Sequence, residues 1–268
     1  MQLELQRAAH TQLLQNTTHS TLMLQVDEAM SRSDFVAAKT LLGAMADLAR
    51  AEAPTRPVDP YIVQRLVLAT YKSKQPSELV ALKDALALLA ELEPDTSVDP
   101  ETLGLSSAIH KRLWGLTDDV AHLDRAIRAA DRGFTLRKDY YNGINLAFLL
   151  NVRAARSPSA SDAVTDFVVA ERIRRDVVSI CDQWLSDNES VEAGSSTVRR
   201  QSADTRYWVL ATRAEALAGL GDPRAESSLD SLRSAAPIAW MADSTRDQID
   251  KLRALLSDSP LKHLDPSV

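Results

Sequence analysis

Uninterrupted helical periodicity is the feature that most constrains what this chain can fold into. The stretch from Asp99 to Arg156 has the pattern of three consecutive helices, with small residues where helices must touch. Asp59-Pro60 and Asp99-Pro100 each place an N-cap acceptor before a proline at the first helical position, which indicates a helix start. The pattern predicts an all-α chain of about eleven helices, with a loop over the polar stretch from Asp187 to Ser202.

Apolar and small residues recur at the spacing of the second helix of a tetratricopeptide repeat. A small residue lets the partner helix approach, and larger residues fill the groove beside it. We expect a tetratricopeptide-like solenoid of helical hairpins, with a single domain over residues 1–258 and a C-terminal tail over 259–268. We also expect close helix contacts at Gly104 and Ala108. The residues that show the four-three step are Ala225, Leu229 and Leu232; Ala38, Leu42 and Met45; and Ala126, Ala130 and Gly133.

The composition of the chain argues against nucleic acid and membranes as partners. The net charge is -6 and no lysine-rich run occurs, so nucleic acid is not expected as the main partner, because phosphate binding needs a basic face. No apolar run approaches the ~20 residues of a membrane span, and no membrane partner is expected. One cysteine, Cys181, excludes an internal disulfide and a multi-cysteine zinc site, and a reducing, cytoplasmic setting fits best.

Catalytic and metal-binding signatures are missing from the sequence. It has no Gly-rich phosphate loop, no Gly-x-Ser-x-Gly and no zinc-protease motif, so we expect no enzymatic activity, no cofactor and no metal. His110 and His122 are twelve residues apart, a spacing that fits no compact ligand motif and favours a structural role. Cys181 is flanked by apolar residues and is expected to be buried. The arginines at positions 172, 174 and 175 are expected on a solvated face, with an acidic-partner site as the minority interpretation.

A tyrosine- and asparagine-rich cluster marks the middle of the chain. It runs Asp139-Tyr140-Tyr141-Asn142-Gly143-Ile144-Asn145, and it follows Gly104, Ala108-Ile109-His110-Lys111-Arg112-Leu113-Trp114, Ala126-Ile127 and Gly133-Phe134. The block from Leu103 to Leu150 resembles the helical TRAF-binding region of the apoptosis signal-regulating kinases and its bacterial relatives. The resemblance implies a tetratricopeptide-like fold that binds proteins and regulates an attached or neighbouring effector. Because this chain has no kinase or other effector motif, the family's partner is not carried over.

The same cluster supplies the candidate partner-binding residues. Tyr141, Asn145 and Phe148 lie three or four residues apart and so share one helix face. The alternative is that the asparagines tie neighbouring helices together through buried hydrogen bonds. For Asn145 we favour this anchoring role, and for Tyr140 or Tyr141 we favour partner contact. The full candidate set is Tyr140, Tyr141, Asn142, Asn145 and Phe148.

The sequence therefore predicts a non-enzymatic scaffold or regulatory module that binds a protein partner through a helical-repeat groove and serves a signalling or defence effector. The alternative is a small-molecule sensor or enzyme with a site between helices. A deep closed pocket lined by His110, Asp139 and Tyr141 would favour that alternative. The sequence makes no prediction about the partner's identity or the oligomeric state.

Overall fold

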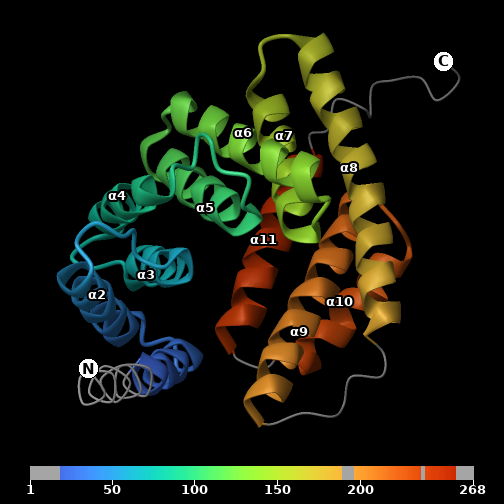
Figure 1. Cartoon of the computed structure of the whole chain (residues 1–268). Coiled ribbons are helices and arrows are strands. Elements are labelled where there is room, and N and C mark those ends of the chain that lie inside the picture. Colours follow the sequence, from blue (N-terminus) through green and yellow to red (C-terminus); the bar gives the residue numbers. More distant parts are fainter. Residues whose placement is uncertain (1–18, 189–195, 237–238, 258–268) are drawn as a thin grey trace, which may run out of the picture. The chain divides into compact units, whose positions relative to one another are not determined.

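The computed structural model describes residues 19–188, 196–236 and 239–257. Every regular element among these residues is helical, and no strand occurs in them, which confirms the all-α prediction. Backbone contacts divide the chain into two compact units, Met1–Ser97 and Val98–Val268, and each is described by itself (Figure 1). A single domain over residues 1–258 stays a prediction, and the expected tail at 259–268 lies outside the described residues.

The first unit is a series of packed helices. Helix α3 packs against both α2 and α4. The Asp59 carboxylate accepts a hydrogen bond from the Tyr61 backbone N–H at 2.9 Å, and Pro60 is the first helical residue, as the start signal predicts. The elements are a helical stretch over residues 19–31, α2 (Phe35–Glu52), α3 (Pro60–Ser73), α4 (Glu78–Leu89) and the 3-10 turn η1 (Ala90–Leu92).

The second unit is built from helical hairpins. Helices α5 and α6, α7 and α8, and α9 and α10 pack as consecutive pairs. The Asp99 carboxylate accepts from the Thr102 backbone N–H at 2.7 Å and so caps the first of these helices. The elements are α5 (Pro100–Thr117), α6 (Val120–Arg137), α7 (Tyr140–Arg156), α8 (Ala160–Asp187), α9 (Ser196–Gly219), α10 (Arg224–Ala235) and α11 (Ala239–Ser257).

The first helices of these hairpins form a row. Helix α7 contacts both α5 and α9, and α11 contacts α9 and also α7 (Figure 1). The hydroxyls of Tyr207 and Thr245 lie 3.0 Å apart, and further along both helices Gln248 donates to Glu215, so α9 and α11 run in the same direction. We call the side of the second unit that α5, α7, α9 and α11 share the first-helix face.

Small residues lie where helices meet, as predicted. Ala126 and Ala130 on α6 are fully buried, and Ala108 is buried on α5. A Cβ added at Gly104 would lie 2.8 Å from the Tyr141 ring, so a larger residue there would displace that ring from its seat between α5 and α7.

Three helix-to-helix turns share one construction. In each, a residue with left-handed backbone dihedrals is followed at once by an aspartate whose carboxylate caps the next helix. The second and third of these turns connect their helices with only two residues, and the first uses three, residues 32–34. The pairs are Ser33-Asp34 (φ 60° at Ser33), Asp118-Asp119 (φ 55° at Asp118) and Lys138-Asp139 (φ 51° at Lys138).

The predicted loop from Asp187 to Ser202 is wrong over its second half, because α9 begins at Ser196. Residues 189–195 lie outside the described residues. Polarity by itself does not indicate a loop, since arginine and glutamine, which occur at positions 199 to 201, are good helix formers.

Candidate functional site

The N-terminus of α7 is held by a buried asparagine. The Asp139 carboxylate accepts from the Asn142 backbone N–H at 2.8 Å and from the Asn142 Nδ2 at 2.9 Å. The same Nδ2 lies 3.3 Å from the carbonyl oxygen of Pro100, at the start of α5. Asn142 is 1% exposed. Its side chain therefore ties α7 to α5, which is the anchoring role that the sequence left open for the asparagines.

Two further glycines let this segment pack closely. A Cβ added at Gly133 would lie 2.6 Å from the Asn142 Cγ, and one added at Gly143 would lie 2.6 Å from a Val177 methyl carbon. Contacts this short exclude any side chain at either position unless the neighbour moves. A glycine inside a helix destabilises it relative to alanine. At position 143 close packing explains the glycine, because it lets α7 approach α8.

The five candidate partner-binding residues differ in accessibility. Tyr141 lies over Gly104 and is 44% exposed. Tyr140 is half-buried against the core, and burial, followed by the nearby Cys181 thiol, raises the pKa of its phenol to about 12. Asn142 and Phe148 are buried, and Asn145 is half-buried. Tyr141, with parts of Tyr140 and Asn145, is what this segment exposes on the surface. Partner binding by these residues stays a prediction.

A polar cluster on the first-helix face begins at Lys111 of α5. Its ammonium donates to the Asn145 Oδ1 at 2.9 Å and lies 5.2 Å from the centroid of the Phe148 ring. Asn145 in turn donates from its Nδ2 to the Tyr141 carbonyl oxygen at 2.9 Å. These bonds join Asn145 to α5 and to its own helix, and its anchoring role stays a prediction. We name the inner polar cluster by six residues: Lys111, Asn145, Asn151, Arg174, Glu215 and Gln248.

Glu215 supplies the carboxylate of the inner polar cluster. It is 8% exposed, and its Oε1 accepts from the Gln248 Nε2 at 2.9 Å. Burial raises the pKa of the Glu215 carboxyl, while the hydrogen bond from Gln248 and the charges of Lys111 and Arg174 act in the opposite direction. Side chains from α5, α8 and α11 therefore influence one carboxyl group on α9.

Arg174 is the most deeply buried charge of the second unit's described part. Its side chain is 0% exposed, and its Nη2 donates to the Asn151 Oδ1 at 2.6 Å. It lies against the backbone of α9, where a Cβ added at Gly219 would come within 2.2 Å of the Arg174 Nε. Burial lowers the pKa of the guanidinium to about 10, although the Glu215 charge raises it. The sequence prediction of a solvated face is wrong for Arg174, because α8 packs against both α7 and α9.

The two histidines that the sequence separates by twelve residues meet in the structure. The Nδ1 atoms of His110 and His122 lie 2.9 Å apart, and the rings are stacked with centroids 5.1 Å apart. Asp139 and Tyr141 lie elsewhere, near Pro100 and Gly104 at the start of α5. Gly104 is about 9 Å from His110 along that helix, at ~1.5 Å per residue. The described residues therefore do not bring His110, Asp139 and Tyr141 into one pocket.

Cys181, the one cysteine of the chain, is enclosed. Cys181 is fully buried, as predicted, and burial raises the pKa of its thiol to about 12. No group of three or more histidine, cysteine, aspartate or glutamate side chains in the described ranges is arranged to hold a metal ion.

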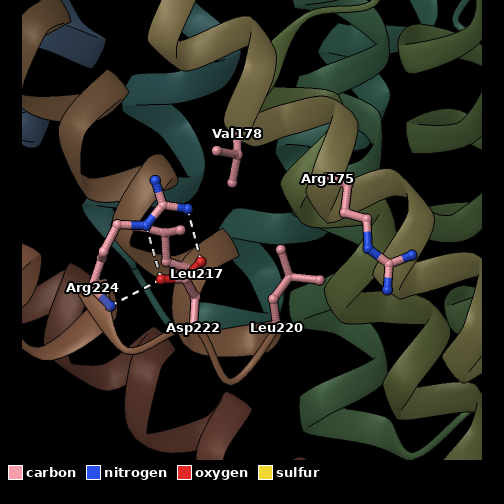
Figure 2. Close-up of a pocket in the computed structure, with 6 residues that line it drawn as sticks. All are labelled: Arg175, Val178, Leu217, Leu220, Asp222 and Arg224. Atoms are coloured by element: carbon pink, nitrogen blue, oxygen red, sulfur yellow. Dashed lines mark hydrogen bonds and ion pairs between the residues drawn. The ribbon is translucent and has the colours of Figure 1, made fainter.

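A second polar surface lies where α9 turns into α10. A pocket of about 340 Å³ lies here. Figure 2 shows Arg224 folded over Asp222, with Arg175 on the opposite side. Arg224 donates to both Asp222 carboxylate oxygens at 2.9 and 2.7 Å and lowers the pKa of that carboxyl to about 2. Arg175 pairs with Glu171 at 3.1 Å, so each arginine already has an acidic neighbour. The lining residues are Arg175, Val178, Leu217, Leu220, Asp222 and Arg224.

A comparison with protein families gives a match over part of the chain. Residues 34–150, from the start of α2 into α7, match the model described as Tetratricopeptide Repeats-Sensor. These residues form a tetratricopeptide-like helical domain. Such domains are in general non-enzymatic modules for protein interaction or sensing. Neither the curated proteins nor the solved structures gave a match. Among the described helices, none has the length and apolar character needed to cross a membrane.

Proposed function

We propose that this chain is a non-enzymatic regulatory module that binds a protein partner through the first-helix face of its second unit. The exposed ring of Tyr141 is the observation that carries the proposal. A large aromatic side chain that is 44% exposed yet seated on Gly104 is a rigid apolar anchor, and such residues dominate affinity at many interfaces. The accessible edges of Tyr140 and Asn145 lie one turn or less away.

The anchor is preorganised by the packing beneath it. Asn142 is fixed by Asp139 and Pro100, so the start of α7 has little freedom to lose when a partner binds. The resemblance to the TRAF-binding region of the apoptosis signal-regulating kinases, whose bacterial relatives sit beside signalling or defence domains, supports a signalling or defence effector as the beneficiary. A cytoplasmic setting and a scaffold role are part of this proposal.

The test compares two exposed tyrosines. Affinity purification with quantitative mass spectrometry uses the full chain, Tyr141→Ala and the matched control Tyr61→Ala, since Tyr61 is 51% exposed on α3. We expect a partner that the full chain and Tyr61→Ala retain and that Tyr141→Ala loses, with direct binding then measured between the purified proteins. Circular dichroism must show that each variant is folded. Partner binding that survives alanine at both Tyr140 and Tyr141 would remove this segment from the interface.

A small-molecule sensor is the second candidate function. The inner polar cluster favours it, because polar and charged side chains from five helices converge on the first-helix face, in part buried. The described residues offer no activated nucleophile at Cys181 and no metal-binding group, so a sensor fits this cluster better than an enzyme.

A further inference from the structure

The polar atoms left without partners in the inner polar cluster are all hydrogen-bond donors. The Nε and Nη1 of Arg174 and the Nδ2 of Asn151 are buried and have no partner among the described residues. One water molecule accepts two hydrogen bonds at most, whereas these three nitrogens carry more than two N–H groups, so a group with several acceptor oxygens satisfies them more fully.

Charge points to the same kind of ligand. Lys111 and Arg174 are both close enough to Glu215 to influence its ionisation. Glu171, which is ion-paired with Arg175, also acts on Arg174. Three cations therefore share two carboxylates. Asn151 and Gln248 contribute amides and no charge. A buried guanidinium without a full set of acceptors is costly, and an added anion would offset both the missing charge and the missing acceptors.

The arrangement also limits the size and the route of the ligand. Lys111, Asn145 and Gln248 are half-buried and form the accessible rim of the cluster, whereas Arg174 is fully enclosed. The guanidinium also lies against the backbone of Gly219, so a ligand that reaches it does so with a small group rather than a large one. We propose that the inner polar cluster binds the oxyanion group of a small molecule, a phosphate or a carboxylate, among α7, α9 and α11. This proposal rests on the second candidate function and gives its ligand class.

Thermal unfolding of the purified full chain tests the proposal at pH 7.5 and constant ionic strength. Sodium phosphate, sulfate and acetate are the probes, and sodium chloride is the reference salt. We expect at least one oxyanion to raise the Tm beyond the chloride value, because a ligand of the folded state stabilises it by mass action. Stabilisation by phosphate and sulfate indicates a phosphate-bearing ligand, and stabilisation by acetate indicates a carboxylate.

Asn151→Asp is the decisive variant. It places a carboxylate 2.6 Å from Arg174 without a change in size, so the protein itself would supply the acceptor. We expect the variant to have a higher Tm than the wild type in chloride and to lose the oxyanion-dependent shift. Asn188→Asp, which adds the same charge at the C-terminal end of α8, is the matched control and keeps the shift.

A second variant guards against misfolding of the first. Glu215→Gln removes the competing carboxylate, and we expect it to bind the stabilising oxyanion several-fold more tightly by calorimetry. The proposal is overturned if no oxyanion exceeds chloride, if the shift persists in folded Asn151→Asp, or if Glu215→Gln binds no more tightly. Neutral acetamide separates this claim from the sensor function. If acetamide stabilises the wild type as well as acetate does, the ligand is uncharged, and the oxyanion claim fails while the sensor candidate stands.

Discussion

Replacement of Gly133 by alanine tests how tightly the α7 segment is packed. In an ordinary helix this change stabilises by up to ~1 kcal/mol. Here the new Cβ would lie 2.6 Å from the Asn142 Cγ and 2.8 Å from both amide atoms. Asn142 cannot move away cheaply, because it is 1% exposed and its Nδ2 is shared between Asp139 and Pro100.

The magnitude follows from these opposing effects. Overpacking a tight interface costs ~1–3 kcal/mol, and each hydrogen bond that Asn142 gives up costs a further ~1 kcal/mol. After subtraction of the gain in helix propensity, we expect Gly133→Ala to destabilise by about 1–3 kcal/mol. With Asn142→Ala in the background the obstacle is gone, and the same change should be neutral or stabilising by up to ~1 kcal/mol.

Urea denaturation followed by circular dichroism measures all four members of this double-mutant cycle. Gly115→Ala is the control, because Gly115 lies in α5 of the same unit and a Cβ there would meet nothing within 4 Å. It should raise the midpoint. Equal stabilisation by Gly133→Ala and Gly115→Ala would refute the reasoning, since it would mean that α6 and α7 are not in close contact at Asn142.

Three further outcomes follow from burial. Ala126→Leu should destabilise by ~1–3 kcal/mol, because Ala126 is 0% exposed; an unchanged urea midpoint would contradict this. With a pKa of about 12, Cys181 should react with iodoacetamide at pH 7.5 about a thousandfold more slowly in the folded chain than in urea, and comparable rates would show an accessible thiol. Burial raises the Glu215 pKa, so the folded state holds that proton more tightly and loses stability as pH rises from the ordinary carboxyl value through the raised one. The stability of Glu215→Gln relative to the wild type should therefore increase between pH 4 and pH 8, and a constant difference in urea midpoint would contradict the shift.

Local chemistry explains why much of the fold is predictable from the sequence. The Asp-Pro pairs at 59–60 and 99–100 predict helix starts because the capping carboxylate, the proline and the first turn are neighbours in the chain. The spacing of Ala126 and Ala130 predicts a helix contact, because the residues of a buried helix face recur every three or four positions whichever element packs on that face. Each of these features needs only a few consecutive residues.

The inner polar cluster could not be predicted in this way. Lys111 and Asn145 are 34 residues apart, and Gln248 and Glu215 are 33 apart, so their bonds depend on which helices become neighbours. Arg174 was assigned to a solvated face because a stripe of charges usually marks one. That inference fails for a helix that packs against two neighbours, as α8 does. Periodicity shows that the faces of a helix differ in polarity, but it does not show how many of those faces are buried.

The two-residue turns have a consequence for how the length of this chain can vary. A residue added inside a helix turns the parts on its two sides by about 100° relative to each other about the axis. An insertion between Asp118 and Asp119, or between Lys138 and Asp139, has no spare loop in which to absorb that rotation. It would carry the buried stripe of α6 or α7 toward solvent. Residues 53–59, which join α2 to α3 without helical structure, can take up extra length. Chains of this fold should therefore differ in length at the latter junction and keep the former two unchanged.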